Sequence, residues 1–378
     1  MTYCRICTLA ADHPGISLDA DEICNLCRLD IAAEVLANAQ YATEVYDEFA
    51  ASGPSPHGQY DMLLMYSGGK DSTYLLDKYV NEHGKRVLAY TFEVPFESHH
   101  AAANIDRARA RIAATFVSDR DDVGITTMMR EVFNRPSDTG PGRYLDEKLP
   151  CISCRNFWII RAIKVAVRHR IPYLIQCADP QQLLTEEPRV RTIVRDFHKT
   201  FGAALASEIF GDDLETLLFA DDDELPKIVY PFIASSHRYD SDAIAAELRA
   251  KGLYESSPIE THCTLFPLLN YYSLTRWGCM FYKLNAASHL RAVHHSGQAA
   301  RNTFSIQFPR AADLPSIERR LKEITVDLAH GHGDPAQHEQ DLVQLFLRLD
   351  APEPAARFVA ASFLDLRRTA DVMGINLG

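Results

Sequence analysis

The middle of the chain alternates short apolar runs with longer segments whose apolar residues recur at helical spacing. Apolar runs of strand length occupy 61–66, 85–94, 115–119 and 172–178. Segments with helical spacing occupy 71–84, 101–114 and 156–170. Strands separated by helices of this length are typical of a parallel sheet with helices on both faces. The sequence therefore predicts an α/β fold with a doubly wound parallel sheet.

The two ends of the chain depart from this alternation. Residues 31–52 predict one linking helix, which ends at the Gly- and Pro-containing segment 53–58. Residues 134–149 predict a loop, and the acidic residues of 219–227 predict a solvated connector. From about residue 270 the spacing is helical again, so we expect a helical C-terminal extension.

The composition indicates a soluble protein. The chain has 378 residues and is 47% apolar, which suits two or three domains with one large core. The net charge of −12 and the isoelectric point of about 5.7 disfavour a general attraction to nucleic acid. We find no charged-then-apolar leader and no apolar run near the roughly 18–20 residues of a membrane span. We expect a cytoplasmic protein whose nine cysteines are metal ligands or catalytic thiols rather than disulfides.

A glycine-rich loop, Tyr-Ser-Gly-Gly-Lys-Asp-Ser at 66–72, joins the first predicted strand to the next helix. Backbone amides and the positive end of the helix make such a junction an anion site. The glycines let phosphate approach, Lys70 adds positive charge, and Asp71 is suited to hold Mg²⁺ or water. A Walker loop would need Gly-x-x-x-x-Gly-Lys-Ser/Thr, which is absent. The alternative is an ordinary glycine turn. The predicted phosphate-binding residues are Ser67, Gly68, Gly69, Lys70, Asp71 and Ser72.

Two Cys-x-x-Cys pairs open the chain, Cys4 with Cys7 and Cys24 with Cys27. Each pair can give two thiolates to one tetrahedral ion, so the spacing indicates a structural or docking Zn²⁺ site. So short a segment needs the metal to fold, and the alternative is two unrelated pairs of reduced thiols. We expect four segments along the chain: a zinc ribbon at 1–30, the linking helix at 31–56, the α/β core at 57–265 and the helical region at 266–378.

A second set of cysteines consists of Cys151 and Cys154, at the start of a predicted helix, and the distant Cys263. The N-terminus of a helix lowers the pKa of a thiol, which makes the first two good metal ligands or nucleophiles. Three alternatives are open. Cys151 and Cys154 could act as a persulfide-forming thiol and its resolving thiol without iron, or they could bind a second zinc ion. They could also be structural thiols, with Cys263 simply buried in the core. Cys177 and Cys279 lie in apolar segments, and we expect them in the core.

The segment YSGGKDS resembles the PP-loop of the ATP pyrophosphatase superfamily, over roughly residues 60–265. This resemblance implies a fold like that of the adenine nucleotide α hydrolases. It also implies that ATP is cleaved between its α and β phosphates, a carbonyl oxygen of the substrate is adenylated, and a nitrogen or sulfur nucleophile displaces AMP. ATP and Mg²⁺ are then expected as cofactors, Lys70 and Asp71 as catalytic residues, and Thr91 and Phe92 as contacts to the adenine.

Cys151, Cys154 and Cys263 resemble the ligands of the superfamily's iron–sulfur branch, the tRNA two-thiolation enzymes. The resemblance implies that they hold a [4Fe-4S] cluster and are catalytic, with one open iron that carries sulfide to the adenylated carbon. The stretch QCADPQQ departs from this branch, because Gln181 and Gln182 stand where acids are expected. Asp179 is expected to replace part of that acidic motif beside the nucleotide.

The N-terminal half also resembles the N-acetyl-sugar amidotransferases, in the segments CRICTLAADHPGISLDADEICNLC, YDMLLMYSGGKDSTYLL and AIKVAVRHRIPYLI. Those enzymes take ammonia from a glutaminase partner and convert a sugar acid to an amide or amidine. The second cysteine set would then be structural or bind zinc. A further alternative is a non-catalytic ATP-binding partner subunit.

We therefore expect an ATP-dependent, AMP-forming sulfurtransferase that replaces a carbonyl oxygen of a small molecule, such as a nucleobase, nucleotide or natural-product amide, with sulfur. An amidotransferase and a tRNA thiolase are the alternatives, and the acidic charge favours a small substrate over tRNA. The expected partners are this substrate, a sulfur donor and a second copy of the chain in a homodimer. No membrane contact is expected.

Overall fold

The computed structural model divides the chain into two compact units. The sheet unit consists of Leu36–Met128 and Ser153–His262, and the helical unit consists of Met1–Val35, Met129–Ile152 and Cys263–Gly378. The structure describes residues 2–13, 15–29, 32–56, 58–134, 149–178, 187–211, 213–221, 223–232, 239–256, 263–296, 314–349, 351 and 353–377. The four segments expected from the sequence do not coincide with these units, and their boundaries stay a prediction. In the described residues, no helix is both long and apolar enough to cross a membrane.

The sheet unit is built on five parallel strands in the order β3-β2-β1-β4-β5. The strands are β1 Met62–Met65, β2 Val87–Glu93, β3 Thr115–Arg120, β4 Tyr173–Ile175 and β5 Lys227–Val229. In the centre, Leu64 of β1 pairs with Ala89 of β2 and with Ile175 of β4. Strands β1 and β4 are fully buried, as expected for a parallel sheet with both faces covered. The predicted α/β fold with a parallel sheet is confirmed.

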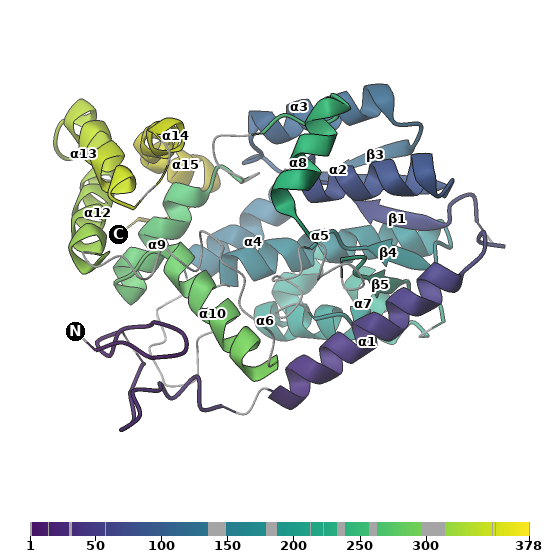
Figure 1. Cartoon of the computed structure of the whole chain (residues 1–378), viewed down its shortest axis with the longest axis horizontal. Helices are drawn as coiled ribbons and strands as arrows, with labels where there is room; N and C mark the ends of the chain where they lie inside the picture. Colours follow the sequence, from purple (N-terminus) through teal and green to yellow (C-terminus); the bar gives the residue numbers. More distant parts are fainter. Residues whose placement is uncertain are drawn as a thin grey trace. The chain divides into compact units, whose positions relative to one another are not determined.

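Helices cover both faces of this sheet (Figure 1). They are α1 Ala32–Ala51, α2 Lys70–Asp77, α3 His99–Arg111, α4 Asp122–Asn134, α5 Leu149–Arg168, α6 Val190–Phe210, α7 Asp213–Phe219 and α8 Ser241–Ala250, and the short π-helix η1, Lys78–Glu82, continues α2. On β2, Ala89 packs in one core cluster with residues of α1, α2, α3 and α8. The next residue, Tyr90, points to the other face. There its hydroxyl and the guanidinium of Arg161 in α5 both donate to the Asp119 carboxylate.

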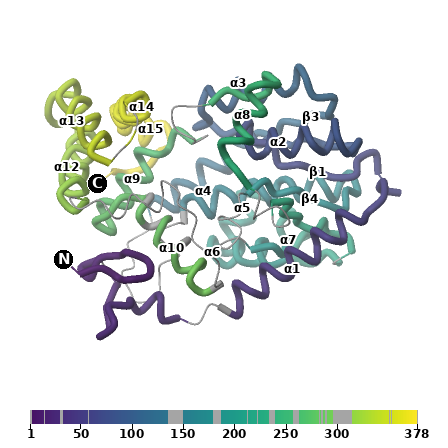
Figure 2. Tube along the Cα trace, viewed as in Figure 1, coloured from purple at the N-terminus to yellow at the C-terminus, as the bar shows by residue number. Residues whose placement is uncertain are grey.

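The helical unit combines the N-terminal segment with the C-terminal helices. These are α9 Phe266–Trp277, α10 Phe281–Ser296, α12 Leu314–His330, α13 Pro335–Leu347, α14 Glu353–Leu364 and α15 Leu366–Met373. Helix α12 packs against α9, α13 and α15, so the expected helical extension is confirmed. In its described residues, 2–13 and 15–29, the N-terminal segment is a looped trace without a helix (Figure 2), tied by isolated bridges between Tyr3 and Ala10 and between Leu18 and Cys24.

Candidate functional site

The predicted phosphate loop lies between β1 and α2, at the carboxyl edge of the sheet. Gly68 has a φ of 71°, and a Cβ at this position would lie 2.5 Å from the carbonyl oxygen of Ala101 in α3. Only glycine fits this conformation and this close approach of backbone. Gly69 follows as the N-cap residue of α2, so no side chain occupies the cap position at the positive end of the helix. The local geometry is that of an anion site.

The serines fix the shape of the loop. The Oγ atoms of Ser67 and Ser72 are 3.2 Å apart, and the Ser72 hydroxyl donates to the carbonyl oxygen of Gly69 over 3.1 Å. The backbone amide of Gly69 in turn donates to the Ser67 hydroxyl over 3.4 Å. The Ser72 side chain is buried and supports the turn from within. The Ser67 side chain is partly buried and lies nearer the surface of the loop.

Lys70 and Asp71 begin α2 and lie side by side. The Lys70 Nζ is 3.2 Å from Asp71 Oδ2, and the two side chains are 12% and 18% exposed. The other carboxylate oxygen, Asp71 Oδ1, accepts a hydrogen bond of 2.8 Å from the hydroxyl of Tyr239. A cation, a carboxylate, hydroxyls and a helix N-terminus therefore meet in one loop, a donor set that suits a diphosphate with Mg²⁺. Nothing in the sequence around Tyr239 predicts this contact.

The strand order places this loop at the point where the chain reverses direction across the sheet. From β1 the chain continues to β2 and β3 on one side, and then crosses to β4 and β5 on the other. Open α/β sheets bind ligands at such a switch point, beyond the carboxyl ends of the strands. Cys177, just after β4, donates from Sγ to the carbonyl oxygen of Met65 over 3.6 Å. Burial and the nearby charge of Asp71 raise the pKa of Cys177 well above its ordinary value.

The expected adenine contacts lie at the end of β2. The Thr91 hydroxyl donates to the carbonyl oxygen of Tyr66 over 3.0 Å, so Thr91 is joined to the start of the loop. Phe92 is buried, 5.3 Å from the ring of Phe157. Both residues therefore lie on the strand next to the loop, and their role toward adenine stays a prediction. Asp179, together with Gln181 and Gln182, lies outside the described residues.

A partly buried polar network, which the sequence did not reveal, joins this edge of the sheet to α5. The guanidinium of Arg161 binds both carboxylate oxygens of Asp119, at 2.7 and 3.0 Å, and Asp121 Oδ2 at 2.7 Å. The Tyr90 hydroxyl donates to Asp119 over 2.8 Å. Burial raises the pKa of the Asp119 carboxyl, but the hydrogen bonds from Arg161 and Tyr90 outweigh it and lower that pKa overall. Two turns of helix separate Arg161 from Cys154, so the network fixes the helix that carries the second cysteine set.

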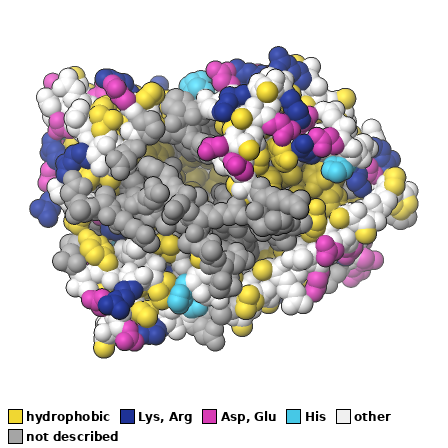
Figure 3. Space-filling model, in the orientation of Figure 1, with side chains coloured by type: hydrophobic (Ala, Val, Ile, Leu, Met, Phe, Trp, Pro, Cys, Tyr) yellow, Lys and Arg dark blue, Asp and Glu magenta, His cyan; other side chains and the backbone are white. Residues whose placement is uncertain are grey.

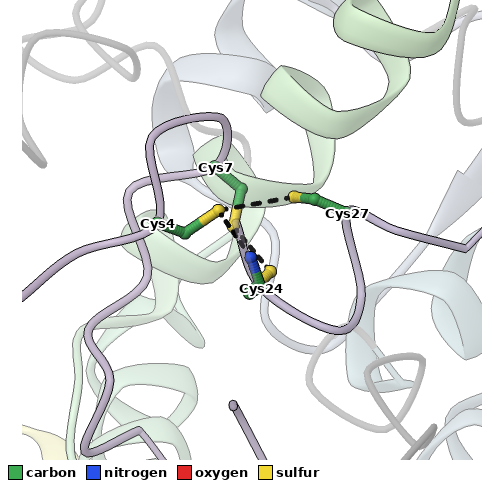
Figure 4. A group of neighbouring side chains, drawn as sticks. All are labelled: Cys4, Cys7, Cys24 and Cys27. Carbon is green, nitrogen blue, oxygen red and sulfur yellow. Dashed lines mark hydrogen bonds between the residues drawn. The ribbon is translucent and has the colours of Figure 1, made fainter. Parts of the chain in front are cut away.

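In the helical unit, the sulfur atoms of Cys4, Cys7, Cys24 and Cys27 converge, all within 4.8 Å of one another (Figure 4). The Sγ atoms of Cys4 and Cys27 are 3.7 Å apart, and those of Cys7 and Cys24 are 3.6 Å apart. A zinc ion with Zn–S bonds of about 2.3 Å has sulfur ligands about 3.8 Å apart at the corners of a tetrahedron. The four buried thiols therefore fit one tetrahedral ion such as zinc.

The surroundings of the four-cysteine cluster come from α9, α10 and the turn between them. Trp277, Cys279 and Ala287 belong to the same buried cluster as the four cysteines. His13, next to the first knuckle, has its Nδ1 3.1 Å from the carbonyl oxygen of Trp277 and 3.8 Å from the Cys279 sulfur. Cys279 is buried, in accord with its expected place in the core. The cluster therefore packs against helices that lie far along the chain, since 264 residues separate His13 from Trp277.

The second cysteine set is distributed between the units. Cys151 and Cys154 lie one turn apart on α5, which passes from the helical unit to the sheet unit between Ile152 and Ser153. Within the helical unit, burial and then the charge of Cys151 raise the pKa of the Cys263 thiol to about 12. The Cys263 sulfur also accepts a hydrogen bond from the amide of Leu265 over 3.3 Å. Cys151 and Cys263 therefore interact electrostatically, and the three-cysteine site stays a prediction.

Comparison with known proteins leaves the family open. No protein-family model and no curated protein matches the chain. Among solved structures, the chain is similar to NMN synthetase from Francisella tularensis, with a TM-score of 0.31, 10% identity, and coverage of 71% of this chain and 98% of that one. It is also similar to the U34-tRNA thiolase NcsA from Methanococcus maripaludis, solved with its [4Fe-4S] cluster, with a TM-score of 0.34, 14% identity, and coverage of 85% and 89%. At these TM-scores neither likeness assigns a function.

Proposed function

We propose that the protein is an AMP-forming enzyme that uses ATP to activate a carbonyl oxygen of a small molecule. The observation that supports this most is the loop after β1, where Gly68, Lys70 and the N-terminus of α2 meet at the switch point of a parallel sheet. An amide oxygen is a poor leaving group, and adenylation turns it into part of a good one. Lys70 and the loop amides would hold the departing pyrophosphate, and Asp71 would hold Mg²⁺.

The proposed nucleophile is sulfur. The carbonyl oxygen of the substrate attacks the α-phosphorus of ATP, the α–β phosphoanhydride bond breaks, and pyrophosphate leaves with the electron pair. Hydrosulfide then forms a carbon–sulfur bond, and AMP leaves with the former carbonyl oxygen. For an amide substrate, the N–H proton lost in the first step is replaced by the proton of hydrosulfide. A [4Fe-4S] cluster, when bound by Cys151, Cys154 and Cys263, supplies an iron that is open to sulfide.

Two features of the second cysteine set support sulfur transfer. Cys151 and Cys154 occupy the first turns of α5, where the positive end of the helix favours thiolates and metal binding. The Arg161 network fixes this helix at the edge of the sheet where the phosphate loop lies. Cys263, which interacts with Cys151, would be the third ligand.

The distribution of charge supports a small substrate. On the face drawn in Figure 3, basic and acidic side chains lie next to one another around α3 and α8. Arg107 pairs with Glu255, and Lys251 pairs with Asp77 at 2.6 Å and with Glu247 at 2.8 Å. These basic groups are matched by carboxylates, whereas binding of a nucleic-acid backbone needs basic groups that can neutralise phosphates.

The decisive experiment combines nucleotide products with metal analysis. Protein purified without oxygen is expected to contain iron and acid-labile sulfide, and to convert ATP to AMP and pyrophosphate when substrate and a sulfur donor are present. The Cys263→Ala variant is expected to lose its iron, whereas Cys177→Ala, which removes another partly buried thiol of the chain, is expected to retain it. Equal iron in Cys263→Ala and wild type would contradict the cluster. Formation of ADP and orthophosphate would contradict the whole proposal.

An amidotransferase is the second candidate, because the four-cysteine cluster that forms in the structure lies in the segment that carries that resemblance. In this case the same adenylated intermediate reacts with ammonia, and AMP still leaves with the oxygen. Iron-free protein that releases AMP and incorporates labelled nitrogen from ammonium salts would favour the amidotransferase. Incorporation of labelled sulfide, lost together with the iron, would favour the sulfurtransferase.

A further inference from the structure

We propose that Tyr239 is a positioning residue that holds the Asp71 carboxylate in the orientation needed for Mg²⁺ and ATP. The proposal rests on the function proposed above. Tyr239 lies 168 residues beyond Asp71 in the chain, directly before α8, yet its hydroxyl donates to Asp71 Oδ1 over 2.8 Å. Asp71 is the first acidic residue of α2 and belongs to the phosphate loop itself.

Tyr239 and Lys70 face different oxygens of the Asp71 carboxylate. Tyr239 donates to Oδ1, and the Lys70 ammonium, 3.2 Å away, faces Oδ2. A carboxylate oxygen has about two lone pairs, so an oxygen that accepts a hydrogen bond can also bind Mg²⁺ or one of its waters. Carboxylates that bind metals are commonly held by such hydrogen bonds, which set their orientation. With its hydroxyl in place, Tyr239 would restrict rotation of the Asp71 side chain about its terminal torsion.

The ring of Tyr239 is anchored to the same helix that carries Asp71. It packs edge-on against Phe232, with ring centroids 5.1 Å apart and an interplanar angle of 80°. Phe232 in turn stacks on Tyr74 of α2, at 6.4 Å and 20°. The three rings form a continuous contact from α2 to Tyr239. The position of the hydroxyl is therefore tied to the helix whose N-terminus forms the anion site.

Helix α8 is also fixed against α2 at its other end. The side chain of Asp240 caps α8 by accepting from the amides of Asp242 and Ala243. At the end of the helix, Lys251 donates to Asp77, the last residue of α2, over 2.6 Å. The two helices are thus joined at both ends, through a tyrosine at the phosphate loop and a lysine at the opposite end. This arrangement gives the Tyr239 hydroxyl a fixed place before any ligand arrives.

The test is the Mg²⁺ dependence of nucleotide binding, measured by isothermal titration calorimetry with α,β-methylene-ATP. In Tyr239→Phe the ring contacts are kept and only the hydroxyl is lost. We expect the Mg²⁺ concentration for half-maximal affinity to rise by roughly 10-fold or more, with binding in EDTA unchanged. Tyr173→Phe is the matched control. Tyr173, on β4, also donates its hydroxyl to a carboxylate, that of Glu48, over 3.1 Å. It is expected to behave like wild type.

A double-mutant comparison separates positioning from stability. If Tyr239 acts through Asp71, Tyr239→Phe has no further effect on the Mg²⁺ dependence in an Asp71→Asn background. Should Tyr239→Phe fail to fold, Phe232→Leu, which keeps the hydroxyl but loosens its ring, is expected to shift the Mg²⁺ dependence in the same direction. An unchanged Mg²⁺ dependence in the folded variant, or an equal shift in Tyr173→Phe, would overturn the inference.

Failure of this inference is distinguishable from failure of the proposed function. If wild-type protein forms AMP and binds the Mg²⁺ complex of the analogue, but Tyr239→Phe matches it, only the positioning role is wrong. If wild-type protein does not bind the analogue at any Mg²⁺ concentration, the proposed function is wrong and the role of Tyr239 falls with it.

Discussion

Removal of the metal from the four-cysteine cluster is expected to unfold the N-terminal segment and expose Trp277. The four sulfurs already lie at separations of 3.6 and 3.7 Å between paired thiols, close to the about 3.8 Å of a zinc tetrahedron. Hydrogen bonds among the thiols lower the pKa of Cys4 and of Cys24 but raise the pKa of Cys7 and of Cys27, so zinc must displace protons from the cluster when it binds. We therefore expect one zinc ion per chain.

The magnitudes indicate that the segment does not stay folded without this ion. Its buried aliphatic side chains Leu9 and Leu26 each contribute about 1.5–3 kcal/mol. Structural zinc contributes about 10–16 kcal/mol at pH 7, as much as the whole net stability of a typical domain, about 5–15 kcal/mol. Loss of zinc therefore removes the largest single contribution to the stability of the N-terminal segment.

The assay uses the fluorescence of Trp277, isolated in a Trp158→Phe variant, since these are the two tryptophans of the chain. Trp277 is 5% exposed against the cluster, so a zinc chelator is expected to shift its emission to longer wavelength. A zinc-sensitive dye measures the released metal in parallel, and chelator preloaded with zinc is the control. The reasoning is refuted if no metal is released, or if one equivalent is released while the emission of Trp277 stays unchanged.

Two further predictions concern the phosphate loop and its strand. Gly68→Ala is expected to abolish ATP binding and to destabilise the fold by more than the about 1–2 kcal/mol of left-handed strain alone, because its Cβ would meet backbone 2.5 Å away. Gly84→Ala is the control for backbone strain without a clash, because Gly84 has a φ of 61° and a Cβ added there would meet nothing within 4 Å. Equal ATP affinity in the two variants would contradict a functional role for the close approach at Gly68. Asp61→Asn is expected to lower the free energy of unfolding by about 2 kcal/mol at pH 7. Burial raises the pKa of Asp61, but hydrogen bonds from Arg86 outweigh it and lower that pKa from 3.8 to about 2. This stabilisation is complete above about pH 4 and is lost as the pH falls toward 2. The free energies of unfolding in urea of wild type and variant should therefore converge at low pH. A difference between them that stays constant with pH would argue against an ionised Asp61.

The strands around the phosphate loop could be predicted because their signal is local. The apolar run 61–66 contains β1, and the six residues after it contain the turn, so one short segment specifies both strand and loop. Helix α4 gave no such signal, since Gly124 and two threonines weaken its helical pattern. Its residues Ile125 and Met128 are fully buried, so tertiary packing forms this helix. The three-residue strand β5 is likewise too short for its periodicity to be detected, and the predicted connector 219–227 overlaps its first residue.

The partners of the loop could not be predicted, because periodicity identifies the face of an element but not its neighbours. Asp71 and Lys70 are adjacent in the sequence, and their proximity needs no fold. Tyr239 reaches Asp71 only because the chain, after β5 at the far edge of the sheet, returns to pack α8 beside α2. The same holds for Arg161, which meets Asp119 across 42 residues. A motif read from the sequence therefore gives the groups that contact the phosphate, whereas the groups that orient them depend on the topology. For this reason variants of Tyr239 test the folded site more stringently than variants of the motif itself.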